Sequence, residues 1–235
     1  EGKTISYDWG EFTPSDVTIP TDDTIYHDGD SFVVDTDTIK HGDSFVDENG
    51  VKWTFDKWSE ESGVIDGSDI NITAEWTSEE GKTISYDWGS FNPGINIPVD
   101  DTIYHNGDEF KVDTDTIKHG DSFVDDNGVK WTFDKWSEES GVIDGNDINI
   151  IAEWTSEEGK TISYNWGEFT PDGFEIPKDD KIYHDGDEFE VKDPGIEKGE
   201  SFIDKDGNKW TYEGLNTESG IVGDDNIVIT PVLRS

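Results

Sequence analysis

The chain has 235 residues, and its 57 acidic and 17 basic side chains give a formal net charge of −40. A surface this acidic cannot neutralise phosphates, so the charge excludes a nucleic-acid-binding protein. The acidic residues are scattered among ten Trp, seven Tyr and twelve Phe, which is typical of a folded protein and not of a disordered tail. There is no cysteine, so disulfides and thiolate metal sites are excluded.

No apolar run approaches the ~18 residues of a membrane span, and no signal peptide is visible. Methionine is absent even at position 1, so we expect a piece of a longer protein. Its export signal and anchor would lie outside the given residues.

The sequence is built from three repeats. The run Glu-Gly-Lys-Thr-Ile-Ser-Tyr begins at Glu1, Glu80 and Glu158, so the repeats follow one another at nearly constant spacing. The segment 41–67 matches 119–145 at every position but one. Each unit carries several strands and its own aromatics, so it is longer than a solenoid repeat. We therefore predict three small domains, 1–79, 80–157 and 158–235.

Each repeat opens with a predicted strand, 4–9 in the first copy. Ile5, Tyr7 and Trp9 alternate with polar residues, which is the period of a half-buried strand. The segment 10–23 follows. Because it contains Pro14 and Pro20 and lacks a helical period, we expect an irregular crossing segment with at most one helical turn.

A hairpin-like turn is predicted at Asp28-Gly29, between 24–26 and 31–34. The strongest hairpin signal is Asn49-Gly50 inside 45–58, because both central residues of the favoured two-residue turn need positive φ. This hairpin returns at 123–136 and, more loosely, at 202–212. We expect Trp53, Trp131 and Trp210 to be buried on its apolar face.

The last strand of the repeat is predicted at 70–76, with Ile70, Ile72, Ala74 and Trp76 on one face. Only 77–81 then separates it from the first strand of the next repeat. Five residues cannot act as a flexible tether, so we expect a stiff joint. The fold class is thus mainly β, with α+β as the alternative if each repeat forms one short helical turn, and we expect an elongated rod.

Catalysis is not expected. A glycosidase needs two placed carboxylates in one pocket, and the candidate Glu11 is Ser90 in the second repeat. An intramolecular isopeptide bond between Lys3 and Asn71 is a weaker hypothesis, because the third repeat has Val228 opposite Lys160. No catalytic or cofactor-binding residue is assigned.

No metal site is assigned either. The histidines at 27, 41, 105, 119 and 184 stand beside turn residues, so solvated turn histidines are favoured over zinc ligands. Asp204, Asp206 and Asn208 resemble the opening of an EF-hand loop, but Lys209 and Leu215 stand where glycine and glutamate are needed. Weak calcium binding at a joint such as Glu79-Glu80 stays open.

Several tryptophans could stack on sugars if they were exposed. Trp58 and Trp136 become Leu215 in the third repeat, and Trp76 and Trp154 become Leu233. That exchange keeps apolar volume and removes a sugar platform, so it favours the core for these positions. Trp9 shares a face with Ile5 and Tyr7, so the core is favoured for it as well.

The run from Asn49 to Trp58, followed by 67–72 and a closing Trp76, resembles the SHIRT domain (streptococcal high-identity repeats in tandem). The opening Ile5-Ser6-Tyr7 and the length also fit. Lys57 and Lys135 depart from the family glycine, which only Gly214 keeps, and the family's helical connection is not apparent. The Listeria–Bacteroides repeat is the second-best match.

The resemblance implies a structural stalk segment of a bacterial cell-surface adhesin, anchored to the cell wall and extracellular. The tandem repeats would project a terminal binding domain, which lies outside these residues and binds a host or neighbouring-cell ligand. The repeats themselves would be monomeric and have no partner. The alternative is a repeated carbohydrate- or host-protein-binding module in which weak copies act by avidity.

Overall fold

The computed structural model describes all 235 residues. Their contacts divide the chain into two compact units. Unit 1 consists of Glu1–Asp87, Pro98–Asp113 and Glu138–Ile150. Unit 2 consists of Trp88–Ile97, Thr114–Ser137 and Ile151–Ser235. The first repeat therefore lies in unit 1 and the third in unit 2, and the boundary runs through the second.

The regular secondary structure of the chain is almost entirely β, as the sequence predicts. The strands of the first repeat are β1 (Ile5–Asp8), β2 (Ser31–Val33), β3 (Ser44–Val46), β4 (Lys52–Trp58), β5 (Ser62–Val64) and β6 (Ile70–Glu79). The strands of the second are β7 (Ile84–Asp87), β8 (Glu109–Lys111), β9 (Ser122–Val124), β10 (Lys130–Trp136), β11 (Ser140–Val142) and β12 (Ile148–Glu157). Those of the third are β13 (Ile162–Tyr164), β14 (Glu188–Glu190), β15 (Ser201–Ile203), β16 (Lys209–Leu215), β17 (Ser219–Ile221), β18 (Ile227–Ile229) and β19 (Pro231–Arg234).

The connection between the first two strands of a repeat contains no α-helix. In the first repeat 10–23 holds only turns, and the third repeat has a single 3-10 turn, η1 (Gly167–Phe169). The mainly β class is therefore confirmed, and the short helical turn allowed for each repeat is seen only in the third. Gly10 starts the crossing in the left-handed region at φ +70°, and a methyl group there would lie 2.7 Å from the carbonyl oxygen of Ala74.

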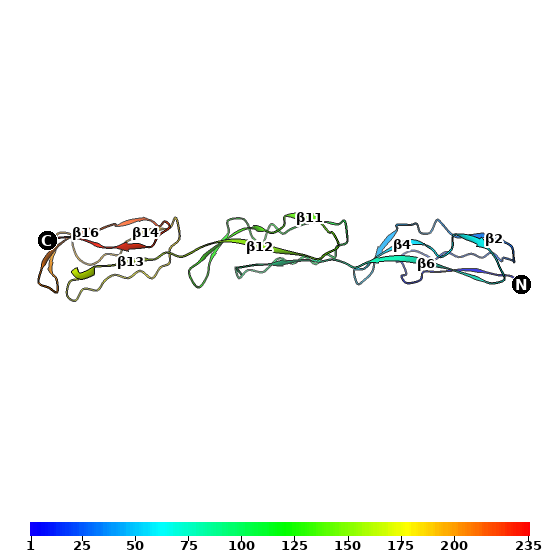
Figure 1. Cartoon of the computed structure of the whole chain (residues 1–235), viewed down its shortest axis with the longest axis horizontal. Helices are drawn as coiled ribbons and strands as arrows, with labels where there is room; N and C mark the ends of the chain where they lie inside the picture. The colour runs from blue at the N-terminus through cyan, green and yellow to red at the C-terminus, as the bar shows by residue number, and fades with distance from the viewer. The chain divides into compact units, whose positions relative to one another are not determined.

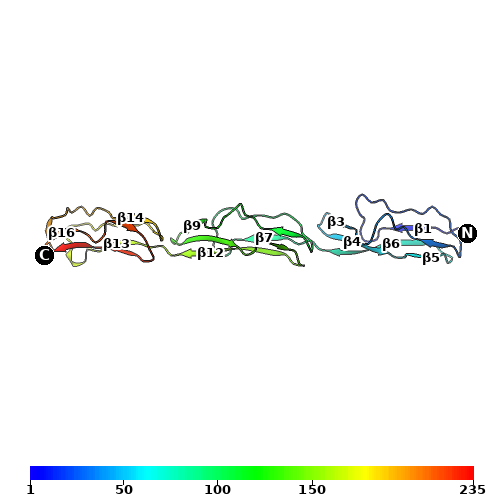
Figure 2. The same cartoon turned by 90° about the horizontal axis from the view of Figure 1, so that it is seen from above.

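The main sheet of the first repeat has the strand order β1-β6-β4-β3 (Figure 2). β3 and β4 form the predicted antiparallel hairpin, in which Phe45 pairs with Trp53. On the side of β4 opposite to β3, β6 pairs with β4 in antiparallel orientation. β6 also pairs with β1 in parallel orientation, so the first and last strands of the repeat lie side by side (Figure 1). A second sheet pairs β2 with β5.

The predicted hairpin around Asp28-Gly29 is wrong. Gly29 makes the turn with φ +90°, but β2 pairs with β5, which follows the whole central hairpin in the chain. Tyr26 instead forms a bridge with Lys3. The short segments on either side of the turn therefore pair with other parts of the repeat and not with each other. The local turn signal was correct, and the long-range pairing could not be read from it.

The core of the first repeat lies between the two sheets. Alternation in β1 and β6 directs Ile5, Ile72 and Ala74 inward, and all three are buried. A β-bulge at Asp56 adds one residue to β4, so that Phe55 and Trp58 both reach the core although an odd number of positions separates them. The core is completed by Trp9, Phe32, Val34, Ile39 and Ile65.

The buried cluster of the third repeat repeats several positions of the first, with Val222 in place of Ile65 as the one smaller side chain. Its buried cluster is Ile162, Tyr183, Phe189, Val222 and Ile229. β16 has a bulge between Tyr212 and Gly214, at the place of the bulge in β4. The tryptophans predicted to be core are buried at 9, 58, 88, 136 and 166, and half-buried at 76 and 154.

Candidate functional site: the hairpin tip and the joint

The hairpin tip differs from the predicted two-residue turn. Asp47 N–H donates to the carbonyl of Val51 and Gly50 N–H to the carbonyl of Asp47, which encloses a three-residue loop. Gly50 has φ +80°, whereas Asn49 stays out of the positive-φ region. This is a turn followed by a left-handed glycine, the usual form of a three-residue hairpin loop.

The Asp47 carboxylate explains why this form is adopted. Its Oδ1 accepts hydrogen bonds from the amides of Asn49 (2.9 Å) and Val51 (3.0 Å), and its Oδ2 from the indole Nε1–H of Trp53 (2.9 Å). Asp125 and Asp204 make the same contacts with Trp131 and Trp210. The sequence signal was available, because an Asp stands six positions before a Trp in all three repeats.

These three tryptophans are half-buried and not fully buried as expected. In the first repeat the indole of Trp53 stacks on Phe12 with ring centroids 5.4 Å apart and planes 2° apart. Phe91 stacks on Trp131 in the same way, and Phe169 meets Trp210 edge-on. Because Phe12, Phe91 and Phe169 lie in the crossing segments, these segments pack over the hairpin tryptophans.

The hairpin should be sensitive to acid. The indole hydrogen bond from Trp210 and the loop amides lower the pKa of Asp204 to about 2, and the same kind of contact lowers the pKa values of Asp47 and Asp125. A folded-state pKa below the unfolded value of about 3.9 contributes stability that is present above pH ~4 and is lost as the pH falls towards 2.

We expect Asp204→Asn to flatten the pH dependence of stability of the third repeat between pH 4 and 2, because the carboxylate no longer titrates there. Chemical denaturation at several pH values, followed by amide signals of the third repeat, measures this. A parent and a variant with equal pH slopes in that range would show that the Asp204 contacts do not persist in solution.

The joint between the first and second repeats lies within unit 1. β6 continues beyond Trp76 to Glu79, where it pairs with Lys52 of β4. Lys82 is already bridged to Tyr104 of the second repeat. Of the predicted connection 77–81, only Glu80 and Gly81 are thus outside paired structure.

The hairpin tip of the first repeat contacts the second repeat across this joint. His105 Nε2 lies 2.8 Å from the carbonyl oxygen of Gly50, and since a carbonyl only accepts, Nε2 carries the hydrogen. Asn106 N–H donates to Glu79 Oε1 at 2.6 Å. A methyl group at Gly50 or at Gly81 would lie within 2.9 Å of Cγ2 of Ile103, which wedges between the two glycines.

The same contacts recur within unit 2 at the joint between the second and third repeats. His184 Nε2 donates to the carbonyl of Gly128 (2.7 Å), and Asp185 N–H donates to Glu157 Oε1 (2.6 Å). Ile182 takes the place of Ile103. His105 and His184 are each only 6% exposed, so the expectation of solvated turn histidines is wrong for these two.

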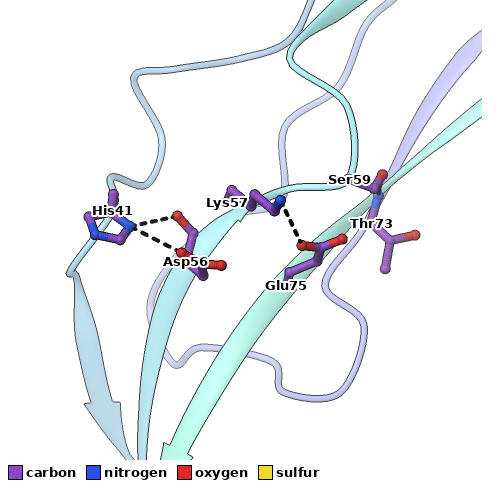
Figure 3. Close-up of polar contacts among 6 residues, drawn as sticks. All are labelled: His41, Asp56, Lys57, Ser59, Thr73 and Glu75. Atoms are coloured by element: carbon purple, nitrogen blue, oxygen red, sulfur yellow. Dashed lines mark hydrogen bonds and ion pairs between the residues drawn. The ribbon is translucent and has the colours of Figure 1, made fainter.

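The remaining histidines are on the surface. His41 Nδ1 lies 2.8 Å from the carbonyl oxygen of Asp56, the extra residue of the bulge, and 3.4 Å from its carboxylate (Figure 3). Lys57 and Glu75 face each other across β4 and β6 in the same view, 3.8 Å apart. His119 repeats the contact of His41 with Asp134. Exposed pairs of this kind contribute little stability.

The other candidate residues are not brought together. Glu11 is exposed on a turn. Lys3 bridges Tyr26, whereas the Asn71 side chain accepts a hydrogen bond from Ser6, so the structure does not pair Lys3 with Asn71. No group of three or more His, Cys, Asp or Glu residues could hold a metal ion. No helix is long and apolar enough to span a bilayer.

The calcium candidates are engaged in other contacts. The Asp204 carboxylate accepts from the hairpin loop and Trp210, and Glu79 accepts from the amide of Asn106. We therefore expect the melting temperature to differ by less than about 2 °C between calcium and chelator. Calorimetry in both buffers tests this, and a rise of about 10 °C with calcium would reveal a site that the contacts do not indicate.

Two surface grooves occupy equivalent places in the first and third repeats. The first has a volume of about 560 Å³, with Ile39, Phe55 and Trp58 on its floor. The second has about 570 Å³, with Ile196, Tyr212 and Leu215 in those positions. The rim changes as well, from His41 and Lys57 to Lys198 and Gly214. A ligand common to both grooves would meet different side chains in each.

No family model and no curated protein matches this chain. Among solved structures it is similar to "Streptococcal High Identity Repeats in Tandem (SHIRT) domains 3-4 from cell surface protein", with 20% sequence identity and a TM-score of 0.28. That match covers 66% of this chain and 97% of the other. The resemblance to SHIRT repeats that the sequence predicts is thus confirmed as a likeness to this neighbour.

Proposed function

We propose that these repeats are a structural stalk segment of a bacterial cell-surface adhesin, anchored to the cell wall and extracellular. Three small domains, 1–79, 80–157 and 158–235, would space a terminal binding domain from the wall. That domain would carry the ligand-binding activity, and the repeats would be monomeric and have neither a partner nor a catalytic role.

The observation that carries this proposal is the joint that occurs twice with the same contacts. A stalk must hold consecutive domains at a fixed orientation, and the two hydrogen bonds and the isoleucine packed against two glycines at each joint support such a role. The strand before the joint continues to Glu79 or Glu157, which leaves little backbone free to bend. The net charge of −40 adds repulsion between the domains.

The distribution of constant residues also favours a structural role. The residues that stay the same in all three repeats are the opening run Glu-Gly-Lys-Thr-Ile-Ser-Tyr, the Asp–Trp pair of the hairpin, and the His-containing turn before the second strand. Other exposed positions vary, as in Glu11 and Ser90, or His41 and Lys198. A binding module acting by avidity would need a constant exposed patch in every copy.

Small-angle scattering of the 235-residue chain tests the proposal. From compact-domain scaling, three domains in series should span at least roughly 90 Å and stay extended at high salt, where charge repulsion is screened. A particle with a radius of gyration of about 20 Å, the size of a single globule of this length, would contradict the stalk.

The second candidate is the carbohydrate- or host-protein-binding module, and the two equivalent grooves favour it. Its strongest difficulty is the exchange of Trp58 for Leu215 on the floor. Titration of the chain with neutral oligosaccharides, followed by the amide signals of Phe55 and Tyr212, distinguishes the binding module from the stalk. Parallel shifts at both residues with one ligand would support binding over the stalk.

A further inference from the structure

The first repeat carries the same joint surface as the other two, but no hairpin tip within residues 1–235 lies against it. Ile25 and His27 stand where Ile103 and His105 stand in the second repeat, and Ile182 and His184 in the third. The His27 side chain is 69% exposed, against 7% for His184. Ile25 is 58% exposed, against 45% for Ile103 and 41% for Ile182.

This uncovered surface is already in the docked geometry. His27 N–H donates to Asp30 Oδ2 at 2.7 Å, as His105 and His184 do to their aspartates at 2.8 Å. Nδ1 of His27 lies 3.8 Å from Asp30 Oδ2, close to the 4.0 Å between His184 and Asp187. The turn and the ring are therefore arranged before any partner arrives, which reduces the entropy cost of docking.

The chemistry of the surface defines what fits it. By analogy with the two joints, Nε2 of His27 would donate to a backbone carbonyl, and the N–H of Asp28 would donate to a carboxylate. Ile25 already lies against Gly2, as Ile103 lies against Gly81. It needs one further position without a side chain from the partner, because Ile103 and Ile182 also lie against Gly50 and Gly128 of the preceding repeat. A hairpin tip with a left-handed glycine, next to a strand that ends in Glu, supplies all three at Gly50–Glu79 and at Gly128–Glu157.

We propose that Gly2, Ile25, His27 and the amide of Asp28 form a docking surface for the hairpin tip and terminal strand of another repeat of this kind that is joined to Glu1 in the same chain. This inference rests on the proposed stalk function, since it uses the same joint. An Asp at position 28 does not oppose docking, because Asp185 in the same position donates its amide to Glu157. The interface is heterologous, with a tip on one side and a histidine face on the other, so it adds repeats in one direction.

The test places a copy of residues 80–157 directly before Glu1. The new junction then reads Glu-Trp-Thr-Ser-Glu-Glu-Gly-Lys, as 75–82 does, so no linker has to be designed. We expect amide exchange at Asp28 to slow at least tenfold, to the level of Asn106. The nitrogen spectrum of the His27 ring should change to that of the Nε2–H tautomer, which the contact with the Gly50 carbonyl requires of His105.

His27→Ala in the four-repeat chain is the matched variant, because an exposed side chain can be removed without disturbing the core. It should return Asp28 exchange at least halfway to that of the three-repeat chain. Unchanged Asp28 exchange in the four-repeat chain, with Asn106 and Asp185 still protected, would overturn the docking surface and leave the stalk intact. Rapid exchange at Asn106 and Asp185 would show that the joint contacts do not form in solution, and it would overturn both the docking surface and the stalk.

A further outcome concerns a second molecule as the occupant. If His27 and Asp28 signals of the three-repeat chain changed with protein concentration, the surface would belong to self-association and the proposal would be overturned. The net charge of −40 on each molecule opposes that association.

Discussion

Replacing Phe55 by Ala should unfold the first repeat while the third stays folded. Phe55 is 3% exposed and contacts Trp58 and Trp76 edge-on, with ring centroids 5.4 and 5.5 Å apart. Truncating a buried Phe costs about 3–5 kcal/mol, because the cavity adds to the lost burial. A unit of about 80 residues has little more net stability than that.

Trp53→Ala is the matched comparison on the same strand. Trp53 is half-buried, and its loss removes one stacking contact and one hydrogen bond to Asp47, which costs about 2 kcal/mol. Amide exchange resolved by repeat in the full chain measures both variants. Equal protection of the first repeat in the Phe55→Ala variant and the parent would show that the core is not organised around β4. An unchanged stability for Trp53→Ala would instead favour an exposed ligand platform.

The sequence predicts the local elements well because each depends on neighbouring residues. The alternation of Ile5, Tyr7 and Trp9 defines β1, and the Asn49-Gly50 pair locates the central hairpin. The exchange of Trp58 for Leu215 correctly indicates core. In these cases the physical cause, a side-chain period or the conformational freedom of glycine, acts within about ten residues.

The features that could not be predicted depend on partners far along the chain. Nothing near Ser31 indicates that β2 pairs with β5, or that β1 runs parallel to β6. Phe55 and Trp58 do not fit one strand period, and the bulge at Asp56 that brings both into the core was not predicted from the sequence. The three-residue loop at Gly50 depends on hydrogen bonds to the Asp47 carboxylate, which the Asn49-Gly50 pair alone does not indicate.

The joint shows the same distinction most sharply. His27 and His105 have nearly the same neighbours, Tyr-His-Asp-Gly-Asp and Tyr-His-Asn-Gly-Asp, so no local pattern separates them. Within residues 1–235 the His27 side chain is exposed, whereas His105 is buried because it meets the hairpin tip of the first repeat. The length of 77–81 alone predicts a stiff connection, whereas the contacts across the joint come from Gly50, Glu79 and 103–106.

This pair of histidines supplies the second large effect. His105→Ala should loosen the joint in unit 1, because it leaves the buried carbonyl of Gly50 without its donor, which costs about 1–3 kcal/mol. His184→Ala should do the same in unit 2 through Gly128. His27→Ala should change the stability of the chain by less than about 0.5 kcal/mol, since its ring is exposed.

The three variants carry the same substitution in three nearly identical turns. Differences between them therefore measure the effect of the joint contacts and not the effect of losing a histidine from the turn. We expect amide exchange at Asn106 to accelerate about tenfold in His105→Ala and to remain unchanged in His184→Ala and His27→Ala. Scattering should also show greater bending for the two joint variants. If all three behaved like the parent, orientation would be set by Glu80-Gly81 alone, and the hairpin tip would be a neighbour of the next repeat without holding it.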